Sequence, residues 1–183
     1  MKTPFYTSEE LQNLGLKSFG KNVLISRKAS FYGAEEICLG DNVRIDDFCI
    51  LSGKINAGSY IHIAAFCALY GSQGIEINDF SGFSPNCMVF SAFDDFSGEY
   101  LIGPTIPPKF TNVTGGKITF SKYVQIGAGT IIFPSLSIGE GTVVGAMSLV
   151  NKSLPEWSIF AGIPAKFIKK RKKGLLELAK NLE

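Results

Sequence analysis

The sequence lacks the features that define several common classes of protein. No stretch approaches the roughly 18 consecutive apolar residues of a membrane-spanning helix, and residues 1–11 have no apolar core of the signal-peptide type. The net charge of +2 is too small for a broad basic surface that binds nucleic acid. Hydrophobic residues make up 45% of the chain and charged residues 19%, as in ordinary globular proteins. We therefore expect a soluble, cytoplasmic protein that does not bind nucleic acid.

Histidine and paired cysteines are also scarce. The chain has one histidine, His62, and four cysteines, none of them in a CxxC pair. A structural zinc site takes its ligands from such cysteine and histidine pairs. The sequence therefore predicts no metal site, and a cytoplasmic chain gives no reason to expect disulfides.

Apolar residues, by contrast, recur at every sixth position through most of the chain. A period of six fits neither the 3.6-residue turn of an α-helix nor the alternation of a strand, but it fits a short strand followed by a turn. The next residue is often Gly, Asp or Asn, and the residue four positions later is usually small. The apolar positions are Ile25, Phe31, Leu39, Ile45, Leu51, Ala57, Ile63, Leu69, Ile77, Phe83, Val89, Phe120, Ile126, Ile132, Ile138, Val144 and Val150.

This pattern is a hexapeptide repeat. Three hexads close one triangular coil of 18 residues, which buries its apolar residues and stacks on the next coil through parallel backbone hydrogen bonds. We therefore predict an all-β fold, a parallel β-helix over residues 21–168. Cys49, Cys67 and Cys87 recur with the coil, so we expect them to stack in one buried column as structural thiols, not as nucleophiles or metal ligands.

Two interruptions and two end segments complete the predicted architecture. Extra residues near 72–74 predict a small outward bulge, whereas residues 92–117 leave the repeat and return to it in register. The longer segment is therefore predicted to be a loop extruded from a continuous coil. Residues 1–20 are predicted to form a helical cap with Thr7 as its N-cap, and residues 169–183 a basic C-terminal helix.

The most specific motifs lie near the C-terminal end of the repeat. Residues 124–134 read VQIGAGTIIFP, residues 138–146 read IGEGTVVGA, and residues 161–168 read AGIPAKFI. With the extruded loop, they resemble the left-handed β-helix hexapeptide-repeat acyltransferases, in particular the maltose/galactoside and surface-polysaccharide O-acetyltransferases. The resemblance implies a left-handed coil, a homotrimer with active sites in clefts between neighbouring prisms, and acetyl-CoA as the acyl donor. It also implies direct transfer of acetyl to a sugar hydroxyl in a ternary complex.

The resemblance also implies where CoA binds. Ala128 and Ala146 would meet the pantetheine arm through backbone groups, and the Ala128 amide is the candidate oxyanion donor. Asn151, Lys152 and Lys166 would lie near the adenine and phosphate end, where lysine suits phosphate. The resemblance implies no metal.

The basic run 169–173 has three interpretations. It is a solvated end of the chain, a site that neutralises CoA phosphates, or a contact with an anionic membrane surface. Solvation is favoured first and membrane contact last.

Acyl transfer to a hydroxyl needs a base for the proton and donors for the oxyanion. In the family that the chain resembles, the base is typically a histidine on the segment entering the extruded loop, but here that place holds Asp94. His62 turns outward beside the inward Ile63, and the resemblance implies that this position lies on the acceptor side of the family's cleft. We therefore predict His62 as the general base, with Asp94 or Asp95 as its orienting partner, within the chain or across the trimer interface.

Other polar side chains are assigned more loosely. Asp46 and Asp47, on an earlier coil, are interpreted as turn residues. The residues available to line the acceptor site are Tyr70, Asn86, Glu99 and Tyr100.

Other functions are compatible with the repeat. The same fold could acetylate the amine of a nucleotide-linked amino sugar or an antibiotic, and an amine of lowered pKa attacks without a strong base, which would make His62 dispensable. A pure scaffold would need neither the long loop nor the AGIPAKFI tail. A γ-carbonic-anhydrase-like metal site needs three histidines, which one His62 per chain supplies only at the three-fold axis. We therefore expect a saccharide O-acetyltransferase, with an amino-sugar N-acetyltransferase as the alternative.

Overall fold

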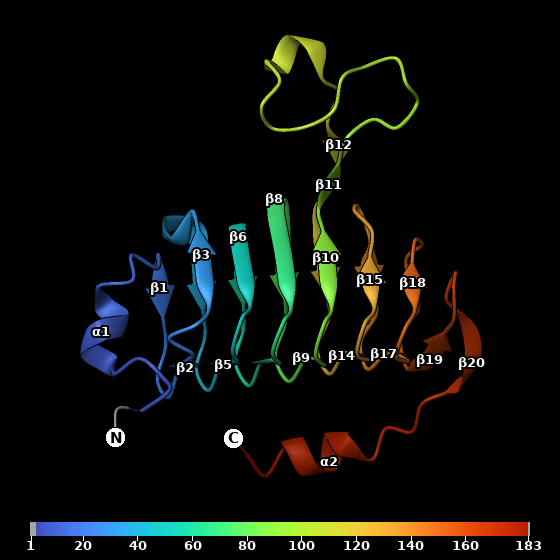
Figure 1. Ribbon diagram of the computed structural model, residues 1–183. Coiled ribbons are helices and arrows are strands. Elements are labelled where there is room, and N and C mark those ends of the chain that lie inside the picture. The colour runs from blue at the N-terminus through green and yellow to red at the C-terminus, as the bar shows by residue number, and fades with distance from the viewer. Residues whose placement is uncertain (1–2, 183) are drawn as a thin grey trace.

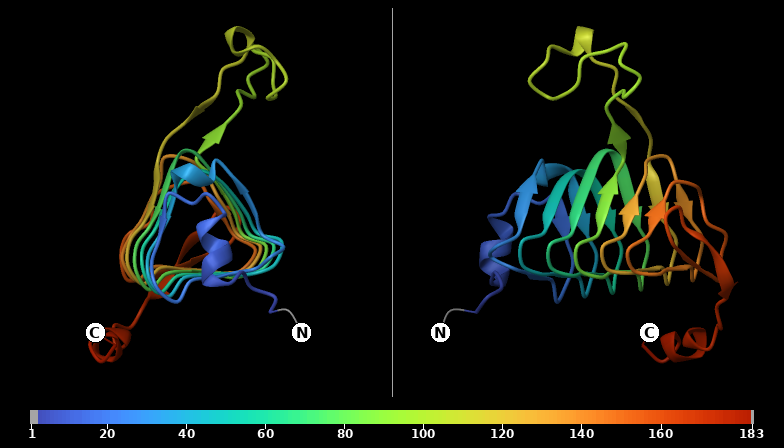
Figure 2. Two further views of the ribbon diagram at one scale, coloured as in Figure 1. Left: turned by 90° about the vertical axis from the view of Figure 1, so that its left-hand side faces the viewer. Right: turned by 45° about the vertical axis from the view of Figure 1, so that its right-hand side comes forward.

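The computed structural model describes residues 3–182, which form a triangular β-helix with a long arm standing away from one corner (Figures 1 and 2). The coils stack from the N-terminal helix at one end of the prism to the last strands at the other. The left-handed parallel β-helix predicted from the repeat is confirmed, because almost all strand pairs are parallel and link successive coils.

Face 1 of the prism is an eight-stranded sheet. Its strands follow in the order β2 (Leu24–Ile25), β5 (Arg44–Ile45), β7 (His62–Ile63), β9 (Gly82–Phe83), β14 (Gln125–Ile126), β17 (Val143–Val144), β19 (Ser158–Ala161) and β20 (Lys166–Lys170). Only the last pair in this order, β19 and β20, is antiparallel.

Faces 2 and 3 belong to one ten-stranded sheet that bends at a corner. Its long strands β6 (Ile50–Ala57) and β8 (Ala68–Ile77) run through both faces. Face 2 also contains β3 (Ser30–Tyr32), β10 (Met88–Phe90), β15 (Ile131–Ile132) and β18 (Leu149–Val150). Face 3 also contains β1 (Ser18–Phe19), β4 (Ile37–Leu39), β13 (Ile118–Phe120) and β16 (Ser137–Ile138).

The coil register follows the six-residue repeat. Ile45 pairs with Ile63 and Leu51 with Leu69, 18 residues further on. The repeated apolar positions are buried, apart from the partly buried Phe31. Where β6 meets β8 the spacing shifts, which confirms the predicted bulge near residues 72–74. The aliphatic positions therefore build the core directly from the repeat.

The corners carry bulky residues in the left-handed backbone region. Tyr60, Phe80 and Tyr123 have φ values of 59°, 59° and 62°, a conformation that costs roughly 1–2 kcal/mol per non-glycine residue. Their rings stack along the corner, with centroids 4.7 Å apart for Tyr60 and Phe80 and 5.2 Å for Phe80 and Tyr123. Stacking between successive coils offsets part of that backbone cost.

The N-terminal segment has the predicted capping box at Thr7, but its helix covers only Ser8–Gln12 of the predicted cap 1–20, and residues 1–2 lie outside the described residues. Helix α1 (Ser8–Gln12) begins with a capping box in which Thr7 Oγ1 accepts from the Glu10 amide and the Glu10 carboxylate accepts from the Thr7 amide. Arg27 donates from both terminal nitrogens to the same carboxylate, at 2.8 and 2.5 Å. The cap is thereby tied to the first coil.

The C-terminal segment turns back beneath the prism and ends in α2 (Leu175–Ala179) (Figure 1), which lines a small pocket together with Phe80 and Tyr123 of the coils. The helix is shorter than the predicted segment 169–183, because residues 169 and 170 belong to β20 and residue 183 lies outside the described residues. Arg171 anchors it by donating to the carbonyls of Tyr123 and Gly141, at 2.7 and 2.9 Å. Lys173 lies over the Trp157 ring. Two members of the basic run thus hold the tail on the last coils, a role that none of the three sequence interpretations included.

We predict that the Glu10–Arg27 pair stabilises the fold only above acidic pH. The hydrogen bonds from Arg27 and Thr7 lower the pKa of Glu10 from 4.5 to about 2. A carboxyl whose pKa is lower in the folded state stabilises the protein above its unfolded pKa and loses that effect as the pH falls towards 2. Glu10→Gln should therefore lower Tm at pH 7, and its difference from wild type should close between pH 4.5 and pH 2.

Glu9→Gln, in the same helical turn, is the matched control. Thermal unfolding followed by circular dichroism measures both variants. An equal loss of Tm for Glu10→Gln at pH 7 and pH 2.5 would contradict the electrostatic origin of the effect.

Candidate active site

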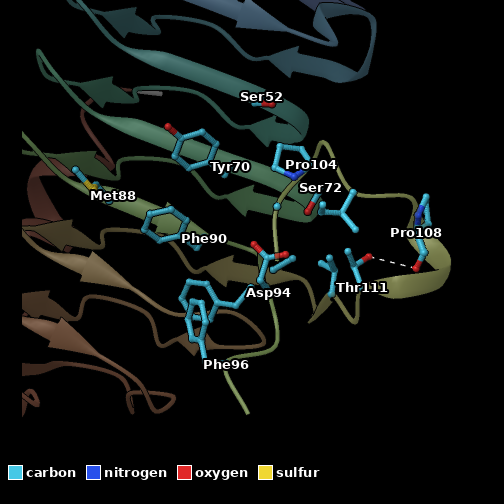
Figure 3. A pocket seen from close by; sticks show the side chains of 15 residues that line it. Ser52, Tyr70, Ser72, Met88, Phe90, Asp94, Phe96, Pro104, Pro108 and Thr111 are labelled. Carbon is cyan, nitrogen blue, oxygen red and sulfur yellow. Dashed lines mark hydrogen bonds between the residues drawn. The ribbon is translucent and has the colours of Figure 1, made fainter. Parts of the chain in front are cut away.

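A pocket of about 810 Å³ lies where the arm leaves face 2 (Figure 3). One wall comes from β6, β8 and β10 of face 2, and the other from the arm. Most of its surface is apolar. The lining residues are Ser52, Tyr70, Ser72, Met88, Phe90, Ala92, Phe93, Asp94, Phe96, Gly103, Pro104, Ile106, Pro108, Thr111 and Val113.

Aromatic rings form the floor of this pocket. Tyr70 and Phe90 occupy paired positions on β8 and β10, so their outward rings stack with centroids 5.3 Å apart. Phe93 packs on Phe90 at 5.5 Å and against Phe133 at 4.7 Å. The floor is therefore continuous from face 2 to the base of the arm, and it is rigid because each ring is held by the next.

The arm contains short elements of regular structure. It leaves the prism through the antiparallel pair β11 (Ala92–Phe93) and β12 (Thr114–Gly115), and it contains a 3₁₀ turn at Pro108–Phe110. Asp95 organises its interior by accepting from the Ser97 amide at 2.7 Å and from Asn112 Nδ2 at 2.8 Å. These bonds, with Ser97 first, hold the pKa of Asp95 below its usual range. Asp95 is thus engaged in holding the arm together.

Asp94 faces the pocket between the aromatic floor and the arm residues Pro104 and Thr111 (Figure 3). Among the described residues that line the pocket, it alone carries a charge. A carboxylate in a largely apolar cavity can bind a cationic group and can accept a proton. The pocket is therefore suited to a ligand that presents an amine or a hydroxyl to Asp94.

His62 lies elsewhere, on face 1. Its Nε2 is 2.8 Å from Asp46 Oδ2, and Arg44 Nε donates to the other oxygen of Asp46 at 2.7 Å. Although partial burial opposes ionisation, the hydrogen bonds from His62 and Arg44 hold the pKa of Asp46 below its usual range. Within one chain the carboxylate that contacts His62 is therefore Asp46, and not Asp94 or Asp95. A contact of His62 with Asp94 or Asp95 across a trimer interface stays a prediction. Asp46 also does more than shape a turn.

This partner was missed because it sits diagonally in the coil stack. Arg44 and His62 are paired directly across β5 and β7, and Asp46 follows Arg44 by two residues on the same outward row. Strand alternation places Asp46 on the outward side of face 1, so the register of the repeat already indicates that Asp46 and His62 are neighbours. Because Asp is common at turns, the sequence alone favours a turn role for Asp46.

The remaining predicted residues are distributed around the prism. Of the four acceptor-site candidates, Tyr70 lines the pocket, whereas Asn86, Glu99 and Tyr100 do not line it within this chain. Asn86 lies exposed at the corner between faces 1 and 2, and Glu99 and Tyr100 are exposed on the arm.

Ala128 and Ala146 occupy adjacent coils at that same corner, where the Met147 amide donates to the Ala128 carbonyl. The neighbouring Gly127 is required by the stack, since a Cβ there would lie 2.5 Å from the Ala146 nitrogen. Asn151 and Lys152 follow β18 at the other end of face 2, and both are exposed. Lys166 begins β20 and is exposed as well.

The three predicted core thiols are buried and unpaired. Cys49, Cys67 and Cys87 donate to backbone carbonyls of the next coil, at 3.1, 3.1 and 3.2 Å. The neighbouring thiols and burial raise the pKa of Cys67. A high pKa and an inward position make it a poor nucleophile. In the part of the chain that the structure describes, no three His, Cys, Asp or Glu residues gather as metal ligands.

Comparisons with known proteins give the class. No protein-family model matches the chain. It is 41% identical over 172 residues to the dTDP-4-amino-4,6-dideoxy-D-glucose acyltransferase of Escherichia coli, which covers 92% of this chain and 90% of that protein. The chain therefore belongs to the hexapeptide-repeat acyltransferases.

Solved structures of AntD, an N-acyltransferase of Bacillus cereus, are similar along the whole chain. Its S84C variant, in complex with dTDP-4-amino-4,6-dideoxyglucose and coenzyme A, is 53% identical with a TM-score of 0.96 and covers 100% of this chain and 98% of that chain. AntD with dTDP and 3-hydroxybutyryl-CoA is 54% identical with a TM-score of 0.96 and covers 99% of this chain and 97% of that chain. A D94N variant of AntD has also been solved with dTDP and coenzyme A.

We predict that Asp95 orders the arm and that Asp94 does not. Asp95→Ala removes both acceptors of the Ser97 and Asn112 bonds, so amide hydrogen exchange across residues 95–112 should accelerate by about tenfold. The β-helix should exchange as in wild type. Asp94→Ala is the matched control. Faster amide exchange of the arm in Asp94→Ala, or an unchanged exchange rate in Asp95→Ala, would contradict the assignment.

Proposed function

We propose that this protein is an N-acyltransferase that moves an acyl group from acyl-CoA to the amine of a dTDP-linked 4-amino-4,6-dideoxyhexose. The observation that carries the proposal is Asp94, which among the described residues is the one charged residue that lines a pocket of otherwise apolar and hydroxyl side chains. An amine matches this carboxylate, and the methyl group of a 6-deoxy sugar matches the apolar lining. The names of the E. coli and B. cereus relatives support the same acceptor. The sugar O-acetylation expected from the motifs becomes the rival outcome.

The reaction needs one proton to move. The neutral amine nitrogen attacks the thioester carbonyl carbon, a C–N bond forms, and the carbonyl oxygen takes negative charge. The C–S bond then breaks as the carbonyl re-forms, and CoA leaves as the thiolate. Attack makes the nitrogen cationic and acidic, so an ordinary carboxylate such as Asp94 is basic enough to accept its proton. The proton passes finally to the departing sulfur.

Acyl-CoA fits the corner between faces 1 and 2. Ala128 and Ala146 have the smallest side chains that retain a Cβ, so a thin pantetheine chain can approach the backbone there. The Ala128 amide is the candidate donor to the oxyanion. Asn151, Lys152 and Lys166 are exposed at the C-terminal end of the prism and serve the adenine and phosphates.

In this proposal His62 is a second basic group that can take the same proton from the acceptor. It lies on face 1, outside the pocket of its own chain, so it would reach the acceptor only if a second copy set its face 1 against the pocket. The exposed Asn86, Glu99 and Tyr100 would line the acceptor site in the same arrangement, with Tyr70 in the pocket floor.

Self-association into a homotrimer supplies that second copy. Among the described residues, the arm carries large apolar side chains that are exposed, including Phe96 at 78% and Leu101 at 57%. Exposed apolar surface on a protruding ordered segment indicates a protein contact. We predict by light scattering a mass three times that of the 19.8 kDa chain. Phe96→Ser/Leu101→Ser should lower it towards one chain, and a wild-type monomer at micromolar concentration would contradict the proposal.

The reaction itself is tested by thiol release from acetyl-CoA with dTDP-4-amino-4,6-dideoxyglucose as acceptor. Asp94→Asn keeps the size of the side chain and removes its basicity, so kcat should fall by about 10²-fold or more. Glu35→Gln, at an exposed acid that does not line the pocket, is the matched control and should retain wild-type kcat. Turnover of hexose hydroxyls alone would reject the amine acceptor, and an unchanged kcat for Asp94→Asn would reject the role of Asp94.

A further inference from the structure

A second cluster of ionisable side chains lies on face 1, outside the pocket. Asp46 stands at its centre, with one carboxylate oxygen 2.7 Å from Arg44 Nε and the other 2.8 Å from His62 Nε2. The Asp46 side chain is only 18% exposed, whereas that of His62 is 53% exposed. A shielded carboxylate therefore supports a histidine that is open to a ligand.

The coil stack builds this cluster. Arg44 and His62 are paired across β5 and β7, so both side chains leave face 1 in the same direction. The Arg44 guanidinium lies over the ring of Phe5, 5.3 Å from its centroid, which fixes it from the N-terminal side. Arg44 thus holds Asp46 through Oδ1, which keeps Oδ2 beside the imidazole of His62.

The contact decides which imidazole nitrogen carries the proton. An ionised carboxylate only accepts hydrogen bonds, and both of its oxygens are occupied here. Nε2 must then donate, so the neutral ring has its hydrogen on Nε2 and its lone pair on Nδ1. The lone pair on Nδ1 is the basic position that His62 offers to a ligand.

We infer that Asp46 is a positioning residue that holds His62 in the Nε2–H tautomer, so that any proton His62 takes from the acceptor goes to Nδ1. The catalytic consequence rests on the proposed function. The tautomer itself does not depend on it, and the two can therefore be tested separately.

The tautomer can be read from one residue, because His62 is the only histidine in the chain. The full-length protein, labelled with ¹⁵N at the histidine ring, gives a single pair of ring-nitrogen signals. At a pH where the ring is neutral, wild type should show the Nε2–H pattern. Asp46→Asn should shift the population towards Nδ1–H. Asp47→Asn, whose carboxylate contacts Ser26 and Lys28 instead, is the matched control and should keep the wild-type pattern.

An Nδ1–H pattern in wild type, or identical patterns in wild type and Asp46→Asn, would overturn the inference. Circular dichroism confirms that each variant is folded. A protein that fails to acylate any nucleotide amino sugar would reject the proposed function, while the ring-nitrogen spectrum would still decide the tautomer.

Kinetics with dTDP-4-amino-4,6-dideoxyglucose test the consequence. His62→Gln keeps a donor near the Nε2 position but has no base, so kcat/KM should fall by about tenfold or more. Asp46→Asn should lower kcat with little change in KM for acetyl-CoA, and Asp46→Glu should have a kcat between those of Asp46→Asn and wild type. The double variant Asp46→Asn/His62→Gln should be no slower than His62→Gln alone. Wild-type kcat in either single variant would overturn the positioning role.

Discussion

The rest of the structure depends on the stacking of one coil on the next. Each coil presents aliphatic side chains inward and a row of backbone donors and acceptors to its neighbour, so burial and hydrogen bonding impose the same register. Any extra residue is forced outward, as at the bulge near residues 72–74 and at the arm. The flat faces of the coils form cavities with segments that leave the repeat, such as the arm and the C-terminal segment. The pocket therefore forms where the arm leaves face 2, beside Asp94.

The features that repeat along the chain could be predicted from the sequence. The core, the thiol column, the extruded arm and the capping box each follow from a local spacing that has one physical solution. The interior of the arm has no period, so its packing around Asp95 could not be predicted. His62 contacts Asp46 diagonally, from one coil to the next. A six-residue pattern gives the residues that are paired directly between coils, but it does not reveal such diagonal contacts.

The sequence motifs do not predict the chemical nature of the acceptor. The hexads predict the prism, and the AGIPAKFI tail predicts its closing segment. Neither motif depends on whether the acceptor presents a hydroxyl or an amine. In the proposed function, the acceptor is selected by the few side chains that line one pocket, which has an aromatic floor and the carboxylate of Asp94. A nucleophilic amine also places a smaller demand on the base than a hydroxyl does, which agrees with a carboxylate at the place where the O-acetyltransferases typically have histidine.

The central claim is that an amine, not a hydroxyl, receives the acyl group. The most direct measurement is a competition in one tube between dTDP-4-amino-4,6-dideoxyglucose and the same nucleotide sugar with a hydroxyl in place of the amine, with acetyl-CoA limiting. Mass spectrometry counts each product, and mild hydroxylamine cleaves an ester but leaves an amide. We predict that the amino sugar takes nearly all of the acetyl groups in a hydroxylamine-stable bond. Preferential acetylation of the hydroxyl analogue, in a bond that hydroxylamine cleaves, would contradict the account.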